Sequence, residues 1–377
     1  MQAVILFVLI VSILAPGAIA QSQWAQAGPA GQAVSLADAL YTVSGLGQSN
    51  TRSYSLDVGA PVWQANSPGM TWHYAVSGNA SVFDADVPGT SSMTQNVYVR
   101  TPSMLWEFPG TTSNSDRLGI SCSDDCNRIV AFSNSTLVAF DAGAPTTIPL
   151  GFTALGVDVA ADGSAVLVTG DLAIRVFSLP TLSTLYSASS SSYTFHAQGM
   201  SGAAERFGIG RIGQVDVYER VGSTYAFSFS HALAGTNYCD RLDISKDGST
   251  LAAAFDFYDT NRKVGLEVVN LVTQATVYSA SWETASMTNF ASGVGISMDG
   301  ATVALGMWGD GSGPVPELVF VRNGLSIGYS MPASVLDLDL AQDGTTCAVG
   351  TKDVHATAGN GTGSVEMWTV PPRSRRR

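Results

Sequence analysis

The sequence has little charge and, beyond its first residues, no long apolar run. Charged residues make up only 13% of its 377 residues, and 18 Lys and Arg stand against 30 Asp and Glu. The resulting net charge of −12 leaves no basic excess to displace phosphate counterions, which argues against DNA or RNA as partners. Hydrophobic residues make up 45%, so the chain has enough apolar surface to fold. With 39 Gly and 15 Pro it is too poor in both for collagen or a low-complexity chain. We therefore expect a soluble, globular protein.

The one long apolar run lies at the N-terminus. Residues 3–15 carry no charge and are followed by Pro16-Gly17 and by the small-x-small sequence Ala18-Ile19-Ala20. Such a run is too short to span a bilayer and is typical of a signal peptide. We predict cleavage before Gln21 and a secreted or secretory-lumen protein without a transmembrane segment. Because no Lys or Arg precedes the run, an uncleaved anchor remains the alternative.

Cysteine is scarce, with four residues at 122, 126, 239 and 347. Cys122 and Cys126 flank a turn that we expect to be two residues longer than its counterparts, and a disulfide would close it in an oxidising compartment. Two free thiols are the alternative, and the state of Cys239 and Cys347 stays open. Zinc is disfavoured because no second cysteine pair or nearby His completes a ligand set. Sequons at Asn79, Asn134 and Asn360 predict a glycoprotein if the host glycosylates.

One pattern recurs along the chain: an alternating apolar strand, a turn built on Asp-Gly, and a second apolar strand. The clearest copies are 157–169, 242–254, 294–306 and 338–350. Asp-Gly between alternating runs predicts a hairpin, because glycine supplies the positive φ of a tight turn. A third and a fourth strand follow most copies, and the units recur at intervals of roughly 40 to 50 residues, as propeller blades do. The sequence thus predicts an all-β, single closed β-propeller of four-stranded antiparallel blades.

Eight blades are favoured and seven are possible, because the first unit, near residues 34–64, is the most eroded. The final unit reaches only three strands before Pro371, and we expect residues 23–27 to supply the fourth and close the ring. Helices should be nearly absent. The expected organisation is a signal peptide at 1–20, one propeller domain at 21–372 and a basic tail at 373–377.

The recurring Ser-x-Asp-Gly-x-x-Leu-Ala-x-Gly, followed by a Val-x-Val-Tyr/Trp strand, resembles degenerate WD-repeat and YVTN-type propellers. Residues 290–306, running on to 317–322, resemble FG-GAP-type repeats of secreted and surface proteins, and residues 54–63 are similar to a quinoprotein-type repeat. The resemblance spans most of residues 30 to 370. It implies a propeller with a binding or scaffolding role and carries no catalytic residue over to this sequence.

Other motif matches carry no function. Gly208-Ile-Gly-Arg-Ile-Gly213 fits GxGxxG and Gly324-Leu-Ser-Ile-Gly328 fits GxSxG, but both lie between strands. A dinucleotide site and a nucleophile elbow each need a helix there. No cofactor is predicted. Calcium remains possible through Asp256, Asp259 and Asp310, since hard cations bind several oxygens.

Loop length is the more informative feature. The loops between the second and third strands of a blade share one face of a propeller, and we expect them to be short in three consecutive units and long at 44–52, 84–95, 256–264, 308–316 and 352–363. Aromatic, acidic and basic side chains of these loops suit a protein or glycan ligand. The candidate ligand-binding residues, with Asn50 alongside, are Arg52, Asp84, Asp86, Asp256, Tyr258, Asp259, Arg262, Trp308, Asp310, Asp353 and His355. The alternative is that polar residues simply solvate variable loops.

Two classes of function follow. The favoured one is a secreted or surface-associated module that binds a protein or glycan through the long loops without catalysis, as a monomer or within a surface assembly. The alternative is an extracellular enzyme (a hydrolase, lyase or quinoprotein-like oxidoreductase) using acids near the central channel. Asp158, Asp243, Asp337 and Asp339 lie on the expected innermost strands. Their structural alternative is a hydrogen bond to a neighbouring blade.

Overall fold

The fold was obtained as a computed structural model. It describes residues 21–372 apart from these positions: 30, 38–40, 47–49, 56–58, 60, 67–69, 77–81, 88–93, 100–102, 110–117, 142–143, 190–196, 236, 258–260, 312, 332–333 and 354–361. All regular structure in the described residues is β-strand, as the sequence predicts.

The strands group into eight consecutive blades. Blade 1 contains β2 (Gly31–Ala37), β3 (Tyr41–Leu46), β4 (Asn50–Ser55) and β5 (Pro61–Asn66), and blade 2 contains β6 (Met70–Val76), β7 (Val82–Val87), β8 (Thr94–Val99) and β9 (Ser103–Pro109). Blade 3 contains β10 (Leu118–Cys122), β11 (Arg128–Ser133), β12 (Thr136–Asp141) and β13 (Ala144–Pro149), and blade 4 contains β14 (Ala154–Val159), β15 (Ala165–Gly170), β16 (Ala173–Ser178) and β17 (Thr184–Ser189). Blade 5 contains β18 (Gln198–Met200), β19 (Arg206–Arg211), β20 (Gln214–Val221) and β21 (Thr224–Ala232), and blade 6 contains β22 (Asn237–Ile244), β23 (Thr250–Phe257), β24 (Lys263–Asn270) and β25 (Ala275–Glu283). Blade 7 contains β26 (Ala291–Ile296), β27 (Thr302–Met307), β28 (Leu318–Arg322) and β29 (Leu325–Tyr329), and blade 8 contains β30 (Ser334–Leu340), β31 (Thr346–Lys352), β32 (Thr362–Thr369) and β1 (Gln21–Pro29).

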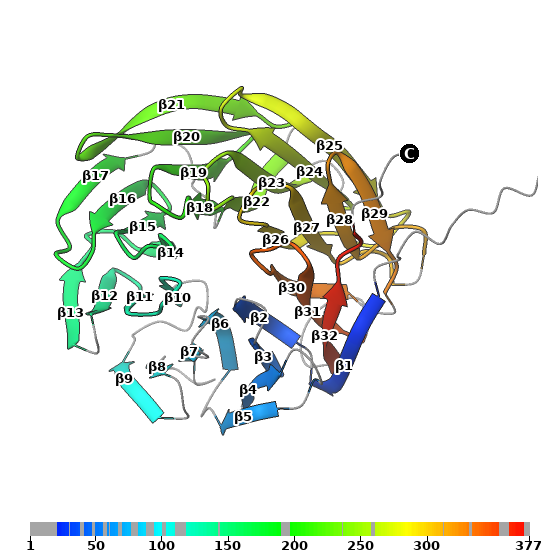
Figure 1. Ribbon diagram of the computed structural model, residues 1–377, viewed down its shortest axis with the longest axis horizontal. Coiled ribbons are helices and arrows are strands. Elements are labelled where there is room, and N and C mark those ends of the chain that lie inside the picture. Colours follow the sequence, from blue (N-terminus) through cyan, green and yellow to red (C-terminus); the bar gives the residue numbers. More distant parts are fainter. Residues whose placement is uncertain are drawn as a thin grey trace, which may run out of the picture.

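Each blade is an antiparallel meander that runs outward from the centre of the ring (Figure 1). Seven of the blades are continuous four-stranded sheets. In blade 2, β6 pairs with β7 and β8 pairs with β9, and β7 lies against β8. The favoured number of eight blades is confirmed, and the eroded first unit is a complete blade.

The ring closes by a strand exchange between the two ends of the chain. β1 pairs antiparallel with β32, with Gln21 opposite Thr369 and Pro29 opposite Thr362. The innermost strand β2 contacts β30 of the preceding blade and β6 of the next, so the circuit of inner strands is continuous. This confirms the predicted closure of the ring by residues 23–27.

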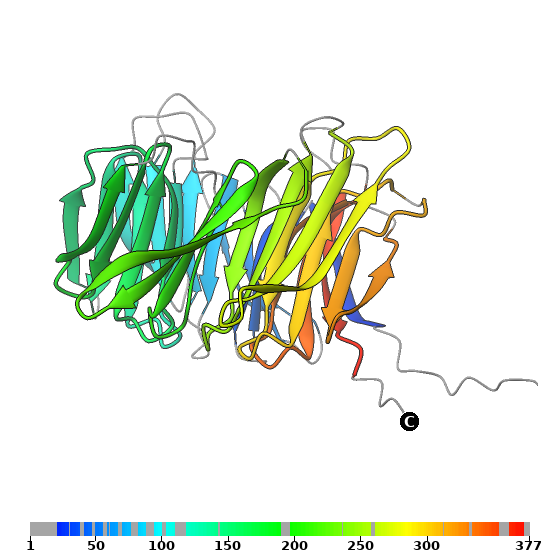
Figure 2. The same ribbon diagram turned by 90° about the horizontal axis from the view of Figure 1, so that it is seen from above.

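The strands cross the disc from one face to the other (Figure 2). The turns between the first and second strands of the blades therefore lie on one face, which we call the turn face; in blades 4, 6, 7 and 8 they carry the Asp-Gly sequences. The loops between the second and third strands lie on the opposite face, which we call the loop face. The short loops predicted in blades 3 to 5 are present at 134–135, 171–172 and 212–213.

The core lies between neighbouring blades. Second strands such as β23 are buried along their whole length because both faces of the blade are covered, which explains their continuous apolar sequence. Phe207 of blade 5 is fully buried and stacks on Tyr218 at 4.6 Å between ring centroids. It belongs to one cluster with Leu167 of blade 4, so each interface joins two blades.

Candidate functional site at the centre of the turn face

The four acids on innermost strands all bond to the next blade. The Asp158 carboxylate accepts the Met200 N–H at 2.7 Å, and that of Asp243 accepts the Ile296 N–H at 3.1 Å. Asp337 and Asp339 accept the N–H groups of Val34 and Leu36 at 2.8 and 2.7 Å, across the closure between blades 8 and 1. The structure thus places these residues where the structural alternative expected them, as links between blades.

The links follow the repeat. Asp158, Asp243 and Asp339 occupy one position of the repeat, and each accepts from the residue one position further along in the next blade. Ser121 fills the same position in blade 3, where its hydroxyl accepts the Val159 N–H at 3.0 Å. Blade 5 has Gly199 there, and a Cβ at Gly199 would lie only 3.1 Å from the Ile244 backbone nitrogen. Either a short acceptor or a glycine therefore fits this narrow inter-blade contact.

Burial controls the protonation of these acids. It raises the pKa of Asp158 to about 7, against the opposing effect of its hydrogen bonds to backbone N–H groups. Burial and the neighbouring charges of Asp158 and Asp339 raise the pKa of Asp243 to about 8. Burial also raises the pKa of Asp337 to about 7, although the positive charge of Arg241 opposes the shift. The pKa values of these three acids therefore lie near neutral pH.

Above this acidic centre, the hairpin turns bond to one another around the axis. The N–H of Asp124 donates to Ala161 O at 2.9 Å, and that of Gly202 donates to Lys246 O at 2.9 Å. The remaining links of this belt run from Asp162 to Gly202, from Asp247 to Met298 and from Met298 to Gln342. In every link the acceptor is the carbonyl oxygen of the residue that occupies the position of Lys246 in its turn, and these carbonyl groups form the rim of a central opening.

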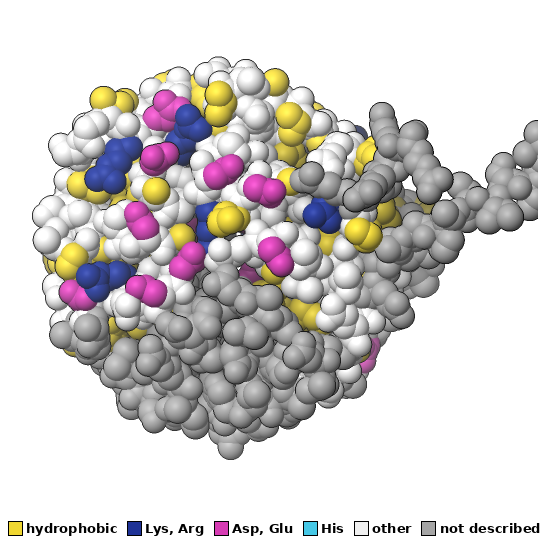
Figure 3. Space-filling view, viewed as in Figure 1, with side chains coloured by type: hydrophobic (Ala, Val, Ile, Leu, Met, Phe, Trp, Pro, Cys, Tyr) yellow, Lys and Arg dark blue, Asp and Glu magenta, His cyan; other side chains and the backbone are white. Residues whose placement is uncertain are grey.

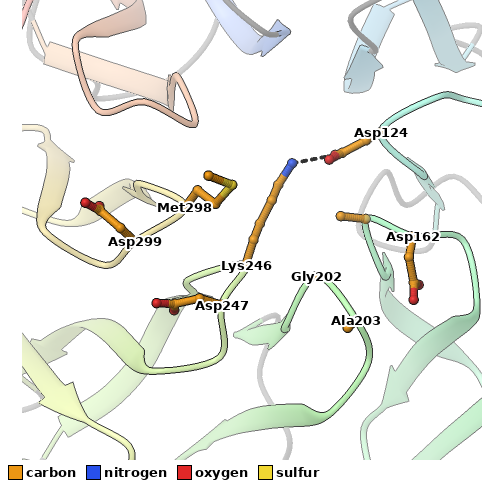
Figure 4. Close-up of a pocket in the computed structure, with 9 residues that line it drawn as sticks. Asp124, Asp162, Gly202, Ala203, Lys246, Asp247, Met298 and Asp299 are labelled. Carbon is orange, nitrogen blue, oxygen red and sulfur yellow. Dashed lines mark hydrogen bonds and ion pairs between the residues drawn. The ribbon is translucent and has the colours of Figure 1, made fainter.

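A cavity of about 500 Å³ lies at this opening, and we call it the turn-face mouth. Five consecutive blades, 3 to 7, contribute its lining (Figure 4). The lining residues are Asp124, Ala161, Asp162, Gly202, Ala203, Lys246, Asp247, Met298 and Asp299. Acidic side chains surround the centre of the described part of this face (Figure 3).

One ion pair bridges the mouth. Lys246 extends from the blade 6 turn across the cavity, and its Nζ lies 2.5 Å from Asp124 Oδ1 of blade 3 (Figure 4). The two residues occupy the same position of their turns, so the propeller geometry alone brings them face to face. Both side chains keep contact with solvent, at 28% and 44% exposure, so the pair can be displaced at small cost.

The other carboxylates of the mouth stabilise their own turns and also present charge. Asp247 Oδ1 accepts the Ser245 hydroxyl at 2.6 Å and the Ser249 N–H at 2.9 Å. Burial tends to raise the pKa of Asp247, but these hydrogen bonds have the larger combined effect and lower it. Asp299 is held in the same way, with its Oδ1 2.7 Å from the Ser297 hydroxyl. The repeat therefore presents carboxylate oxygens at the mouth.

On the loop face, several candidate ligand residues lie in strands where loops were expected. Arg52 is in β4, and Asp84 and Asp86 are in β7, so these loop boundaries were wrong; the side chains of all three lie outside the described residues. Asp256 is in β23 and is only 6% exposed. Its carboxylate accepts the Ala291 N–H at 2.9 Å, and burial together with Asp240 raises its pKa. Asp256 therefore links blades 6 and 7 and is not a loop ligand.

The described loop residues also have structural contacts. Trp308 packs edge to face on Phe290 at 5.0 Å, and Asp310 Oδ1 accepts the Gly313 N–H at 2.7 Å. Buried Glu317, which the sequence reading did not single out, accepts the N–H groups of Asp310, Gly311 and Met331. Burial raises the pKa of Glu317 against these bonds.

Other predicted residues lie apart or outside the described part. Arg262 donates to Ala285 O at 2.6 Å, and Asp353 is exposed, with its N–H bonded to Thr362 O. Asn50 begins β4, and its side chain is not described. Tyr258, Asp259, His355, Asn79 and Asn360 fall outside the described residues. Asn134 sits at the short loop of blade 3 with φ 54°, beside exposed Ser135. In the described part of the chain, no three His, Cys, Asp or Glu residues are arranged to hold a metal ion.

The predicted disulfide is present. Cys122 and Cys126 are bonded, with their Cα atoms 5.2 Å apart. The turn that they close has five residues, 123–127, like the turn at 160–164, so the expected extra length was wrong. Cys239 and Cys347 are buried and unpaired, and burial raises the pKa of each thiol.

The sequence reading missed the turn-face mouth. Its signal was present in the repeat, because the residue before each turn Asp must lie at the axis once the blades form a ring. Among the described turns that position holds Asp124 in blade 3 and Lys246 in blade 6, and the other four have the uncharged residues Ala161, Gly202, Met298 and Gln342 there. Loop length drew attention to the opposite face.

No family model and no curated protein sequence matches the chain. Solved structures do: the β-propeller domain of Cps50 (Swd1) from Myceliophteria thermophila aligns with a TM-score of 0.58 at 9% identity, over 93% of this chain and all of that domain. This likeness shows a WD40-like β-propeller fold. The described residues include no helix long and apolar enough to cross a membrane.

Proposed function

We propose that this chain is a secreted or surface-associated, non-catalytic protein-binding module that receives a basic segment of its partner at the turn-face mouth. The observation that carries the proposal is the cavity of about 500 Å³ in which Asp162, Asp247 and Asp299 accompany the Asp124–Lys246 pair. Three carboxylates beyond the one that Lys246 neutralises attract a cationic side chain. Exposed Met298 (51%) adds an adaptable apolar contact beside them.

The fold and the central acids support a binding role. A β-propeller offers a rigid ring on which turns from many blades form one surface, which suits protein recognition. The four inner acids, which an enzyme would use, already accept backbone N–H groups between blades. The apolar leader and the Cys122–Cys126 disulfide support an extracellular or secretory-lumen location.

Site-specific photo-cross-linking tests this surface. A photoreactive amino acid is placed at Met298 in the mouth, at Ile212 on the loop face and at Trp308 in a long loop, in the chain from Gln21. Met298 and Ile212 form a matched pair, because both are apolar and exposed, at 51% and 40%. We expect one partner to cross-link from position 298 and not from position 212. Lys246→Glu adds to the acidic charge of the mouth, so we expect this variant to give the same cross-linked product.

Each other result has a meaning. Cross-linking from 308 or 212 alone would move the interface to the loop face and overturn the mouth as the site. The absence of any product from all three positions would contradict protein binding. A glycan panel and a thermal-shift assay with and without EDTA, on the same chain, test the alternative ligands, because a ligand of the native state raises the unfolding midpoint.

A further inference from the structure

The turn of blade 3 differs chemically from the corresponding turns of the other described blades. In each of these turns the N–H of one residue closes onto a backbone oxygen three residues earlier, and that residue has a positive φ. It is a glycine in blades 4, 6, 7 and 8, with φ from 66° to 69°, at Gly163, Gly248, Gly300 and Gly344. In blade 3 it is Cys126, with φ 46°. A side chain in this region crowds its own backbone, so the position favours glycine.

A second contact accompanies each non-glycine residue at this position. Blade 5 has Ala204 there with φ 53°, and the Tyr225 hydroxyl donates to its carbonyl oxygen at 2.6 Å. Blade 3 has the disulfide from Cys126 to Cys122, the last residue of β10. The disulfide therefore stands at a position that four of the other described turns fill with glycine.

This disulfide-bonded turn carries one end of the ion pair across the mouth. Asp124 lies between the two cysteines, its N–H bonds to Ala161 O, and its carboxylate holds Lys246. Any change in the turn that displaces Asp124 must release the lysine from the centre of the turn face. The disulfide and one end of the ion pair across the mouth thus belong to the same turn.

We propose that the Cys122–Cys126 disulfide is a redox-sensitive latch, which holds the left-handed turn of blade 3 and so keeps Asp124 on Lys246 across the mouth. A dithiol opens it: the S–S bond breaks, Cys122 and Cys126 each gain an electron and a proton, and the dithiol becomes its own disulfide. Cys126, no longer tied, then leaves the positive φ, and Asp124 moves away from Lys246. The inference concerns the closure of the mouth and holds whether or not a protein partner binds there.

Lysine acylation measures the state of the latch directly. The chain has three lysines, at 246, 263 and 352, and mass spectrometry of peptides resolves them. The oxidised protein is treated with an amine-reactive ester, and the rate at Lys246 is divided by the rate at Lys263 in the same sample. Asp124→Asn sets the value for an open latch. Loss of a part-exposed ion pair should raise the ratio by about two- to fivefold.

Two double variants separate the cross-link from the turn that it holds. Cys122→Ser with Cys126→Ser removes the disulfide and leaves a side chain at the strained position. We therefore expect its ratio of the acylation rates at Lys246 and Lys263 to equal that of the Asp124→Asn variant. Cys122→Ser with Cys126→Gly removes the disulfide but introduces the glycine found in blades 4, 6, 7 and 8. We therefore expect its ratio of acylation rates to equal that of the oxidised natural protein. Dithiol treatment should open the natural protein and leave this glycine variant unchanged. Unfolding midpoints confirm that each variant is folded.

Three results would overturn the latch. An unchanged ratio in the reduced protein and in the double serine variant would show that the turn holds without the disulfide. Equal increases in both double variants would show that the left-handed turn is not what positions Asp124. An unchanged ratio in Asp124→Asn would show that the ion pair does not protect Lys246. Since no partner enters the assay, its result is independent of the cross-linking test above.

Discussion

The buried acids at the centre of the ring predict that this protein loses stability as pH rises from about 4 to about 8. An acid whose pKa is raised on folding binds its proton more tightly in the folded chain than in the unfolded chain. Below pH 3.8 both states are protonated, and the contribution to stability is fully present. Between that value and the folded pKa only the unfolded chain ionises, which favours unfolding; above the folded pKa no further change follows.

Asp243→Asn isolates one of these groups. Asparagine does not titrate and keeps an oxygen that can accept the Ile296 N–H, but its amide nitrogen replaces the oxygen that accepts the Ile244 N–H at 2.8 Å, which lowers the expected gain. The pKa of Asp243 is about 8 in the folded chain and 3.8 as the ordinary value. Between pH 3.8 and pH 7, roughly three pH units, only the unfolded chain ionises at this residue, and this favours unfolding. At 1.36 kcal/mol per unit this gives a ceiling of about 4 kcal/mol. Burial is the largest cause of this shift, and the charges of Asp158 and Asp339 add to it.

Urea unfolding at pH 5 and at pH 8 checks this expectation. We expect the natural chain to be more stable at pH 5 and Asp243→Asn to reduce the difference, with a gain at pH 8 on the order of 1–4 kcal/mol. Asp171→Asn, at an exposed position of a short loop, is the matched control and should leave the slope unchanged. The reasoning would be refuted if the natural chain were equally stable at both pH values. It would also be refuted if Asp243→Asn showed the same change in unfolding free energy between pH 5 and pH 8 as the natural chain.

Three further predictions concern the ring and its contacts. Phe207→Ala should cost about 3–5 kcal/mol of unfolding free energy, because the ring is fully buried against Tyr218, and a cost below about 1 kcal/mol in urea would contradict that packing. Gly199→Val should cost about 1–3 kcal/mol, because a Cβ there meets the backbone of Asp243 and Ile244 at 3.1 Å; an unchanged midpoint would show that the blades can separate. Removal of residues 21–29 should lower the thermal midpoint and promote association through the open edge of β32. A synthetic 21–29 peptide should restore the midpoint, and failure to do so would show that β1 does not close the ring.

Local patterning was enough to predict most of the fold. Alternation such as Leu242-Asp243-Ile244 identified strands, and Asp247-Gly248 marked a turn because glycine tolerates positive φ. Repetition at blade length gave the architecture, and the missing fourth strand of the last unit gave the closure by β1. Strand ends were less predictable, and Asp84 and Asp256 were assigned to loops because a polar residue at the end of a strand has the same local pattern as a loop residue.

The site was less accessible to sequence reasoning. Asp243 could be placed on an inner strand, but whether its carboxylate served catalysis or a neighbouring blade depended on a residue 53 positions away. The Cys122–Cys126 bond was foreseen from spacing, whereas its place at the glycine position of the turn required the aligned hairpins. Loop length pointed to the loop face, since length is visible in a sequence and a cavity is not.

The sequence by itself determined the strands, the turns, the repeat and the strand that closes the ring, because these depend on the chemistry of residues close together in the chain. Only the tertiary structure decided that Asp124 meets Lys246, that five turns enclose a cavity and that buried acids join one blade to the next. The physical reason is closure: a ring of eight blades brings residues 122 positions apart into contact at its axis, and no local pattern records the distance between them.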